Sequence, residues 1–90
     1  MDYKDAIVIF ENNTKRSVVQ IERCSVGIAN YVFIVSTANE KFVLRCSKDE
    51  NAYKDTVYWL NRLSVCEIPI PIVLSEGKYK DYSYLILSYI

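Results

Sequence analysis

One arginine near the middle of the chain is the side chain best suited to bind phosphate. Arg45 belongs to the segment 41–46, whose alternating apolar residues predict a β-strand. A guanidinium is permanently charged and offers forked N–H donors to phosphate oxygens, and a strand holds it better than a loop would. The alternative is a solvated or salt-bridged surface arginine, which is the commoner role of an arginine in a strand.

A turn upstream of this strand contains the second candidate for phosphate binding. Gly27 and Ile28 belong to the turn expected at 25–30, between two predicted strands. Glycine lets the backbone approach a ligand closely, and successive amides in a turn can form an anion-binding concavity. One glycine is a weak signal by itself, and the sequence lacks the G-x-G-x-x-G loop of protein kinases.

The elements that must position these groups follow one another along the chain. Residues 3–12 fit a helix with Asp2 as its N-cap, although the β-branched run at 7–10 also suits a strand. Strands are expected at 18–24, 31–36, 41–46, 72–75 and 82–90, with hairpin connections at 37–40 and 76–81, the latter containing Gly77. In the third strand, Phe42 and Leu44 should face one way and Val43 and Arg45 the other.

A longer helix is expected over 48–63, directly behind the strand of Arg45. Ser47 and Glu50 have the spacing of a capping box, in which each side chain bonds the backbone amide of the other. The inward stripe of this helix is predicted to consist of Tyr53, Val57, Leu60 and Leu63.

In order and spacing, these segments resemble the beginning of an aminoglycoside phosphotransferase. The resemblance covers residues 17–90 and rests on three stretches. Gly-Ile-Ala-Asn-Tyr-Val-Phe at 27–33 is close to the family's Gly-x-x-Asn-x-Val-Tyr pattern. Phe-Val-Leu-Arg at 42–45 resembles the motif of its third strand, and Ile-Pro-Ile-Pro-Ile at 68–72 follows the helix.

The resemblance implies an α+β fold of the protein-kinase-like N-lobe type. We expect a five-stranded antiparallel sheet packed with one main helix at 48–63, with the N-terminal helix outside it. Residues 1–90 would form a single domain, the N-terminal lobe of a kinase-like phosphotransferase. The chain stops on its most apolar stretch, 85–90, as a piece of a longer parent would.

The resemblance also implies where a nucleotide would bind. Arg45 would contact its phosphates, and the turn with Gly27 and Ile28 would cover them. Kinase-like sites pair the strand cation with a helix glutamate. Aligning the helix puts Tyr53 at that position, so Glu50, one turn earlier, is a possible ion-pair partner unless the capping box already uses it.

The adenine would bind between the third and last strands. Val43, on the same strand face as Arg45, would border the base, and Leu87 would flank it. The backbone of Ser88 and Ile90 would hydrogen-bond its edge. Without the resemblance, these residues read simply as parts of a buried strand.

Catalysis is not expected from these 90 residues alone. The nucleotide would be ATP or GTP, but the resemblance places the catalytic aspartate and the Mg²⁺ ligands in a second lobe, beyond Ile90. The chain has no histidine, which excludes a His-based triad, an H-E-x-x-H zinc site and the family's His-x-Asp loop. Phosphoryl transfer needs about 8–23 kcal/mol of barrier lowering, whereas one charge-assisted contact contributes about 1.5–3 kcal/mol.

Composition narrows the class of protein further. Eleven basic and eleven acidic residues cancel, and no Lys/Arg run offers a footprint for nucleic acid or an anionic membrane. With no signal peptide and no apolar run of about 20 residues, a cytoplasmic protein is expected. Cys24, Cys46 and Cys66 fit reduced, packed thiols better than a metal or redox site.

Two other functions remain open from the sequence. The chain could be a stand-alone interaction module whose exposed apolar edge at 85–90 pairs with a partner or a second copy. It could also be the same lobe of a choline, homoserine or methylthioribose kinase, because the resemblance places acceptor specificity in the other lobe.

Overall fold

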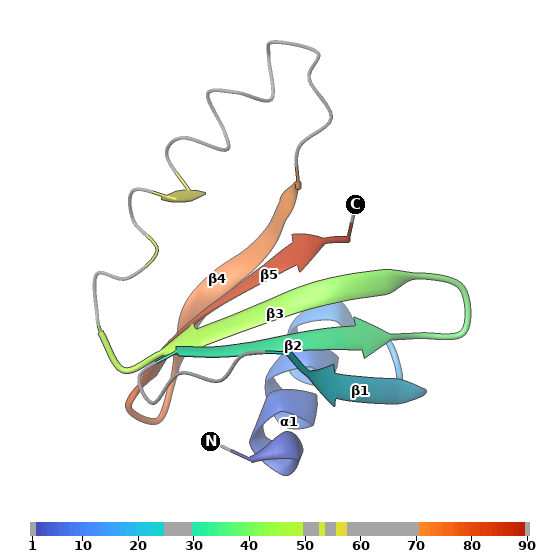
Figure 1. Ribbon diagram of the computed structural model, residues 1–90, viewed down its shortest axis with the longest axis horizontal. Helices are drawn as coiled ribbons and strands as arrows, with labels where there is room; N and C mark the ends of the chain where they lie inside the picture. The colour runs from blue at the N-terminus through green and yellow to red at the C-terminus, as the bar shows by residue number, and fades with distance from the viewer. Residues whose placement is uncertain (1, 25–29, 50–52, 54–55, 58–70, 90) are drawn as a thin grey trace, which may run out of the picture.

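The structure is a computed structural model, and it describes residues 2–24, 30–49, 53, 56–57 and 71–89. The described elements are listed in chain order: α1 (Tyr3–Thr14), β1 (Gln20–Arg23), β2 (Asn30–Ser36), β3 (Lys41–Ser47), β4 (Val73–Tyr79) and β5 (Tyr82–Ser88). The strands form a five-stranded sheet in the order β1-β2-β3-β5-β4, and every neighbouring pair is antiparallel (Figure 1). The predicted α+β fold is therefore confirmed.

The N-terminal segment is a helix, as predicted, and not the competing strand. The Asp2 side chain accepts a hydrogen bond from the Asp5 amide at 2.9 Å and so caps the first turn. Lys15 ends the helix in the left-handed conformation, with φ of 57°, and its amide donates to the Glu11 carbonyl at 3.0 Å.

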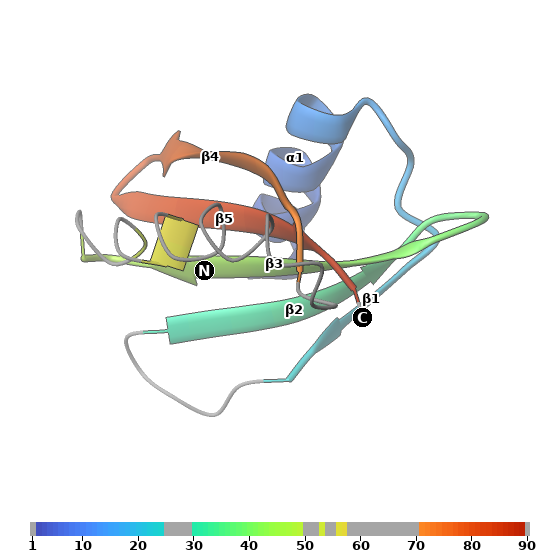
Figure 2. The ribbon, with the colours of Figure 1, turned by 90° about the horizontal axis from the view of Figure 1, so that it is seen from above.

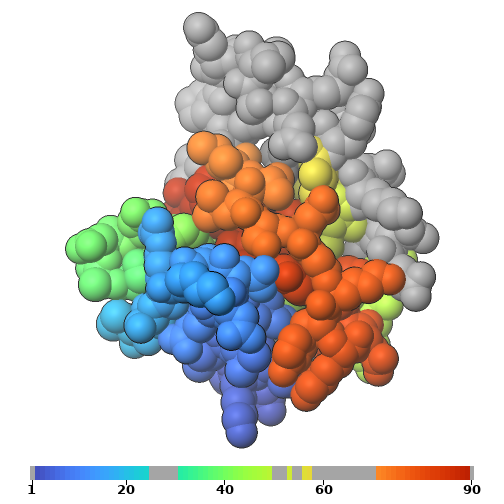
Figure 3. Space-filling model, turned by 180° about the vertical axis from the view of Figure 1, so that it is seen from behind, coloured from blue at the N-terminus to red at the C-terminus, as the bar shows by residue number. Residues whose placement is uncertain are grey.

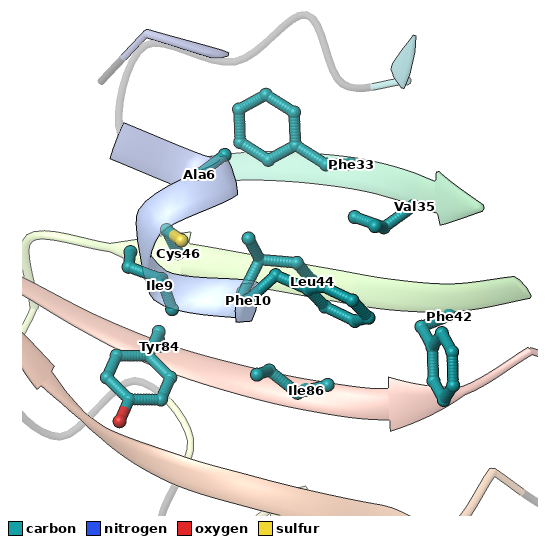
Figure 4. Packing of buried hydrophobic residues seen from close by; sticks show 10 residues of the cluster. All are labelled: Ala6, Ile9, Phe10, Phe33, Val35, Phe42, Leu44, Cys46, Tyr84 and Ile86. Carbon is teal, nitrogen blue, oxygen red and sulfur yellow. The ribbon is translucent and has the colours of Figure 1, made fainter. Parts of the chain in front are cut away.

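Helix α1 covers one face of the sheet (Figures 1 and 2). The larger described core cluster lies between them and consists of Ala6, Ile9, Phe10, Phe33, Val35, Phe42, Leu44, Cys46, Tyr84 and Ile86 (Figure 4). The sequence-based picture treats this helix as an outer addition to a core under the 48–63 helix. Instead α1 itself closes a core, because Ala6, Ile9 and Phe10 recur at helical spacing and are buried. Residues 58–63 of the predicted main helix lie outside the described part of the chain.

Polar contacts attach α1 to the β4–β5 hairpin, which lies beside it on the surface seen in Figure 3. The Asn13 side-chain oxygen accepts hydrogen bonds from the hydroxyls of Tyr84, at 2.9 Å, and Ser75, at 3.1 Å. At the other end of the helix, the Lys80 ammonium lies 3.2 Å from the Asp5 carboxylate. This ion pair holds the pKa of Asp5 below, and that of Lys80 above, its ordinary value.

The predicted hairpin between the last two strands is present, but its connection is shorter than the predicted 76–81. Strand β4 continues through Gly77 to Tyr79, and the turn consists of the residues at 80 and 81, where Lys80 has φ of 53°. Gly77 pairs with Tyr84, and a Cβ at Gly77 would lie 2.6 Å from the Tyr84 Oη. This glycine is therefore required by an aromatic ring and not by a turn.

The expected exposed edge at 85–90 is also wrong for its described part. Strand β5 lies between β3 and β4, so its backbone has a strand on each side. Leu85, Ile86 and Leu87 are all buried. The edges of the sheet are β1 and β4, and pairing of a partner along β5 is excluded by its neighbours.

Candidate functional site

The sheet face opposite α1 carries Arg45, and we call it the Arg45 face. Antiparallel register pairs Val32 with Arg45 and Arg45 with Leu85, and two residues along β3 it pairs Val43 with Leu87. Directly paired residues project from the same face of a sheet. The predicted orientation is confirmed: Phe42 and Leu44 contact the α1 core (Figure 4), and Val43 and Arg45 face the other way.

A second apolar cluster lies on the Arg45 face. Tyr53, Leu85 and Leu87 are its buried members, and Val43, Val57 and Val73 pack against them. Val43 and Leu87, predicted to border an adenine, therefore belong to one apolar surface. Tyr53 and Val57 belong to the predicted inward stripe, and the Val57 amide donates to the Tyr53 carbonyl at 3.0 Å.

The Arg45 guanidinium lies against the ring of Tyr53. Its Cζ atom is 5.5 Å from the ring centroid, within the range of a cation–π contact. Arg45 is half-buried, and no carboxylate among the described residues forms an ion pair with it. The structure thus brings to Arg45 the residue that the sequence-based resemblance aligns with the helix glutamate of kinase-like sites.

Burial keeps Tyr53 in its neutral form. Only 6% of this residue is exposed, and desolvation raises the pKa of its phenol to about 12, although the nearby Arg45 charge acts in the opposite direction. Around neutral pH, the Arg45 cation therefore has an uncharged aromatic neighbour.

Hydrogen bonds join Ser88, at the C-terminal end of β5, to Ile72, the residue before β4. The Ser88 amide donates to the Ile72 carbonyl at 2.9 Å, and the Ser88 hydroxyl accepts from the Ile72 amide at 2.7 Å. The amide of Ser88 therefore already donates a hydrogen bond within the protein and is not a free donor to an adenine.

Four of the predicted site residues lie outside the described part of the chain. They are Gly27, Ile28, Glu50 and Ile90. The one observable half of the predicted capping box is Ser47, whose hydroxyl accepts from the Asp49 amide at 3.2 Å. The phosphate-covering turn and the Glu50 ion pair therefore remain predictions.

Sequence reasoning missed some members of the Arg45 face. Leu85 is two residues before Leu87 on one strand, so period-two alternation was an available signal for it. Val73 could not be found in this way, because only the pairing of β4 with β5 brings it opposite Leu87. The predicted inward stripe contains Tyr53, but no local signal in the sequence predicts its contact with Arg45.

Across the described ranges, no group of three or more His, Cys, Asp or Glu residues could hold a metal ion. In the same residues, no helix is long and apolar enough to cross a membrane. Cys24 and Cys46 are free thiols, the first exposed and the second buried, and burial raises the Cys46 pKa to about 12. Cys66 lies outside the described residues.

Comparison with known proteins gives matches in structure only. No protein-family model and no curated protein sequence matches the chain. Aminoglycoside phosphotransferase APH(4)-Ia superposes with a TM-score of 0.81 at 19% identity, over 98% of this chain and 30% of that one. Spectinomycin phosphotransferase APH(9)-Ia, solved with ADP and spectinomycin, gives 0.78 at 8% identity, over 100% and 30%. A protein of Haemophilus somnus 129PT assigned as a fructosamine-3-kinase gives 0.61 at 16% identity, over 97% and 31%.

These matches agree with the architecture described above. A thermostable APH(4)-Ia variant solved with AMP-PNP and hygromycin B also superposes, with a TM-score of 0.77. The chain spans about 30% of the length of each of these proteins. At such low identities the likeness shows the fold, and the sequence-based resemblance is confirmed at that level. The chain has the kinase-like N-lobe fold of the aminoglycoside phosphotransferases.

Proposed function

We propose that residues 1–90 form the nucleotide-binding N-terminal lobe of an ATP- or GTP-dependent phosphotransferase that acts on an aminoglycoside or a related small molecule. The observation that carries the proposal is the Arg45 face: one half-buried cation among apolar side chains, in a fold shared with proteins solved with AMP-PNP and ADP. Such an enzyme would work in the cytoplasm and could confer antibiotic resistance.

The residues present fit a nucleotide in charge and polarity. The Arg45 guanidinium would donate to the phosphate oxygens, covered by the turn with Gly27 and Ile28. Val43 and Leu87 supply apolar surface for the base, and the backbone of Ser88 and Ile90 would contact its edge. Glu50 stays a proposed ion-pair partner of Arg45.

The chain alone would bind a nucleotide without transferring its phosphate. The ligands of Mg²⁺ would lie in another lobe. The catalytic base and the acceptor site would also belong to that lobe, which corresponds to the remaining length of the structural relatives. A choline, homoserine or methylthioribose acceptor therefore remains an alternative to an aminoglycoside.

The test is nucleotide binding by the 90-residue chain, measured by saturation-transfer NMR with ATP and, separately, GTP up to millimolar concentration. Arg45→Met, which keeps the apolar stem and removes the charge, should weaken binding about tenfold or more, because a hydrogen bond to a charged group contributes about 1.5–3 kcal/mol.

Arg16 offers a matched control. Its guanidinium also lies against an aromatic ring, that of Phe42 at 5.2 Å, and it pairs with Glu40, but on the α1 side of the sheet. Arg16→Met should leave ATP affinity unchanged. The proposal fails if the folded wild-type chain binds neither nucleotide, or if Arg45→Met binds as tightly as wild type.

A further inference from the structure

We infer that Tyr53 is a positioning residue for Arg45: the face of its ring orients the guanidinium, at the helix position where a kinase-like site usually has a glutamate. The inference rests on the proposed function, since it concerns how this lobe would hold nucleotide phosphates. It assigns a role to a residue outside the predicted nucleotide contacts.

The geometry makes the ring a fixed support for a mobile side chain. Arginine has a long side chain that loses much rotamer freedom when it is ordered, and that loss opposes phosphate binding. Tyr53 is buried among Leu85, Leu87 and Val43, so its ring is held by packing. A contact at 5.5 Å with this ring restricts the Arg45 guanidinium before any ligand arrives.

The chemistry of the contact differs from that of an ion pair. A carboxylate accepts guanidinium N–H groups, often two at once, and cancels the positive charge. A neutral phenol ring attracts the cation through its π face and leaves the net charge in place. Among the described residues no carboxylate pairs with Arg45, so none of these carboxylates competes with a phosphate for its N–H donors.

Several cationic side chains in this chain lie against aromatic rings, so a ring contact by itself does not identify a positioning residue. Arg23 lies 4.5 Å from the Tyr31 ring centroid, and Arg16 lies near Phe42. Arg16, however, also pairs with Glu40, and Arg23 is exposed and has a further partner. Arg45 differs from Arg16 and Arg23 because its side chain is half-buried. Within the described part of the chain, the contact that orients its guanidinium is the one with the Tyr53 ring.

A double-mutant cycle on ATP affinity tests this role. Tyr53→Leu removes the ring and keeps an apolar side chain, whereas Tyr53→Phe keeps the ring and removes only the hydroxyl. Tyr53→Leu should weaken ATP binding roughly two- to fivefold, the effect of one partly exposed cation–π contact. The same change should have no effect in an Arg45→Met background, and Tyr53→Phe should bind like wild type.

Three outcomes of the cycle would overturn the inference: an equal loss in both backgrounds, which indicates a purely structural role; a loss in Tyr53→Phe as large as in Tyr53→Leu; or no loss in Tyr53→Leu. In each of these cases, the proposed function would still be supported as long as the wild-type chain binds ATP. Absence of ATP binding by the folded wild-type chain would instead overturn the proposed function and the inference together.

A second measurement needs neither a nucleotide nor the leucine variant, which could fail to fold. The side-chain Nε–Hε signal of Arg45, assigned by its loss in Arg45→Met, should be shifted upfield by the ring current of Tyr53 in the wild type and in Tyr53→Phe. An Arg45 signal at the position typical of a solvated arginine would overturn the inference.

Discussion

Two uncharged side chains lie next to Arg45, although both could in principle ionise. Tyr53 is across from its guanidinium, and Cys46 follows it in β3 on the opposite face. Burial raises the pKa of both groups to about 12, because a phenolate or thiolate loses its hydration there. Near pH 7 neither group offsets the positive charge of Arg45, which suits the binding of an anion.

The raised Tyr53 pKa predicts a loss of stability in alkali. Its ordinary value is 10.0 and its folded value about 12, so its contribution is complete below pH 10 and is lost as the pH rises through about 12. When the pH is raised from 9 to 12, the unfolding free energy of wild type should fall by about 1–3 kcal/mol more than that of Tyr53→Phe, which has no phenol to ionise at this position. Urea unfolding at several pH values measures this. Because Cys46 titrates in both proteins, the informative quantity is the difference in unfolding free energy between wild type and Tyr53→Phe. If that difference did not change with pH, the raised pKa of Tyr53 would be contradicted.

At the scale of elements, the β4–β5 hairpin shows how packing overrides a local signal. Gly77 in a polar stretch predicts a turn by composition. The chain instead turns at 80–81, and Gly77 pairs with Tyr84 within the strand, where the Tyr84 ring leaves no room for a side chain at position 77. The same ring position lets the Tyr84 hydroxyl reach Asn13 at the end of α1.

Gly77→Ala should therefore destabilise the fold by about 1–3 kcal/mol, the usual cost of overpacking, because the new methyl group would lie 2.6 Å from the Tyr84 Oη. Ser75→Ala, in the same strand, removes one exposed hydrogen bond without a clash and should cost less than about 1 kcal/mol. Urea denaturation followed by circular dichroism compares the two. Equal stability of Gly77→Ala and wild type would show that the Tyr84 ring moves away freely.

At the scale of the whole molecule, the two faces of the sheet have different roles. One face packs on α1 and closes the larger described core, and the other presents Arg45 with its apolar neighbours. This division explains why a nearly continuous apolar strand such as β5 is needed: Leu85 and Leu87 serve one face, and Tyr84 and Ile86 serve the other.

The division predicts different reactivity for the two described free thiols. Cys46 is fully buried under α1, whereas Cys24 is exposed just after β1. At pH 8, iodoacetamide should modify Cys24 at least about tenfold faster than Cys46, because only the thiolate reacts and burial suppresses it. Peptide mass spectrometry distinguishes both from Cys66. Similar rates for Cys24 and Cys46 without denaturant would show that α1 does not cover this core.

Local sequence patterns predicted several of the strands, the first helix and the sheet face on which Arg45 lies. Period-two alternation in 41–46 predicted both the strand and the face of Arg45, and an N-cap with helical spacing predicted α1. The resemblance in the order of motifs predicted the kinase-like N-lobe fold. These features depend on residues close together in sequence, whose side chains have few alternative directions once the backbone is a strand or a helix.

Contacts between distant segments decided the rest. The order β1-β2-β3-β5-β4 places β5 inside the sheet, and only this order brings Val73 and Leu87 to the face of Val43. The ring of Tyr53 against Arg45 and the ring of Tyr84 over Gly77 likewise join residues separated by several positions or by a strand. Such pairings follow from which surfaces pack most closely in three dimensions, and a residue's sequence neighbours do not contain that information.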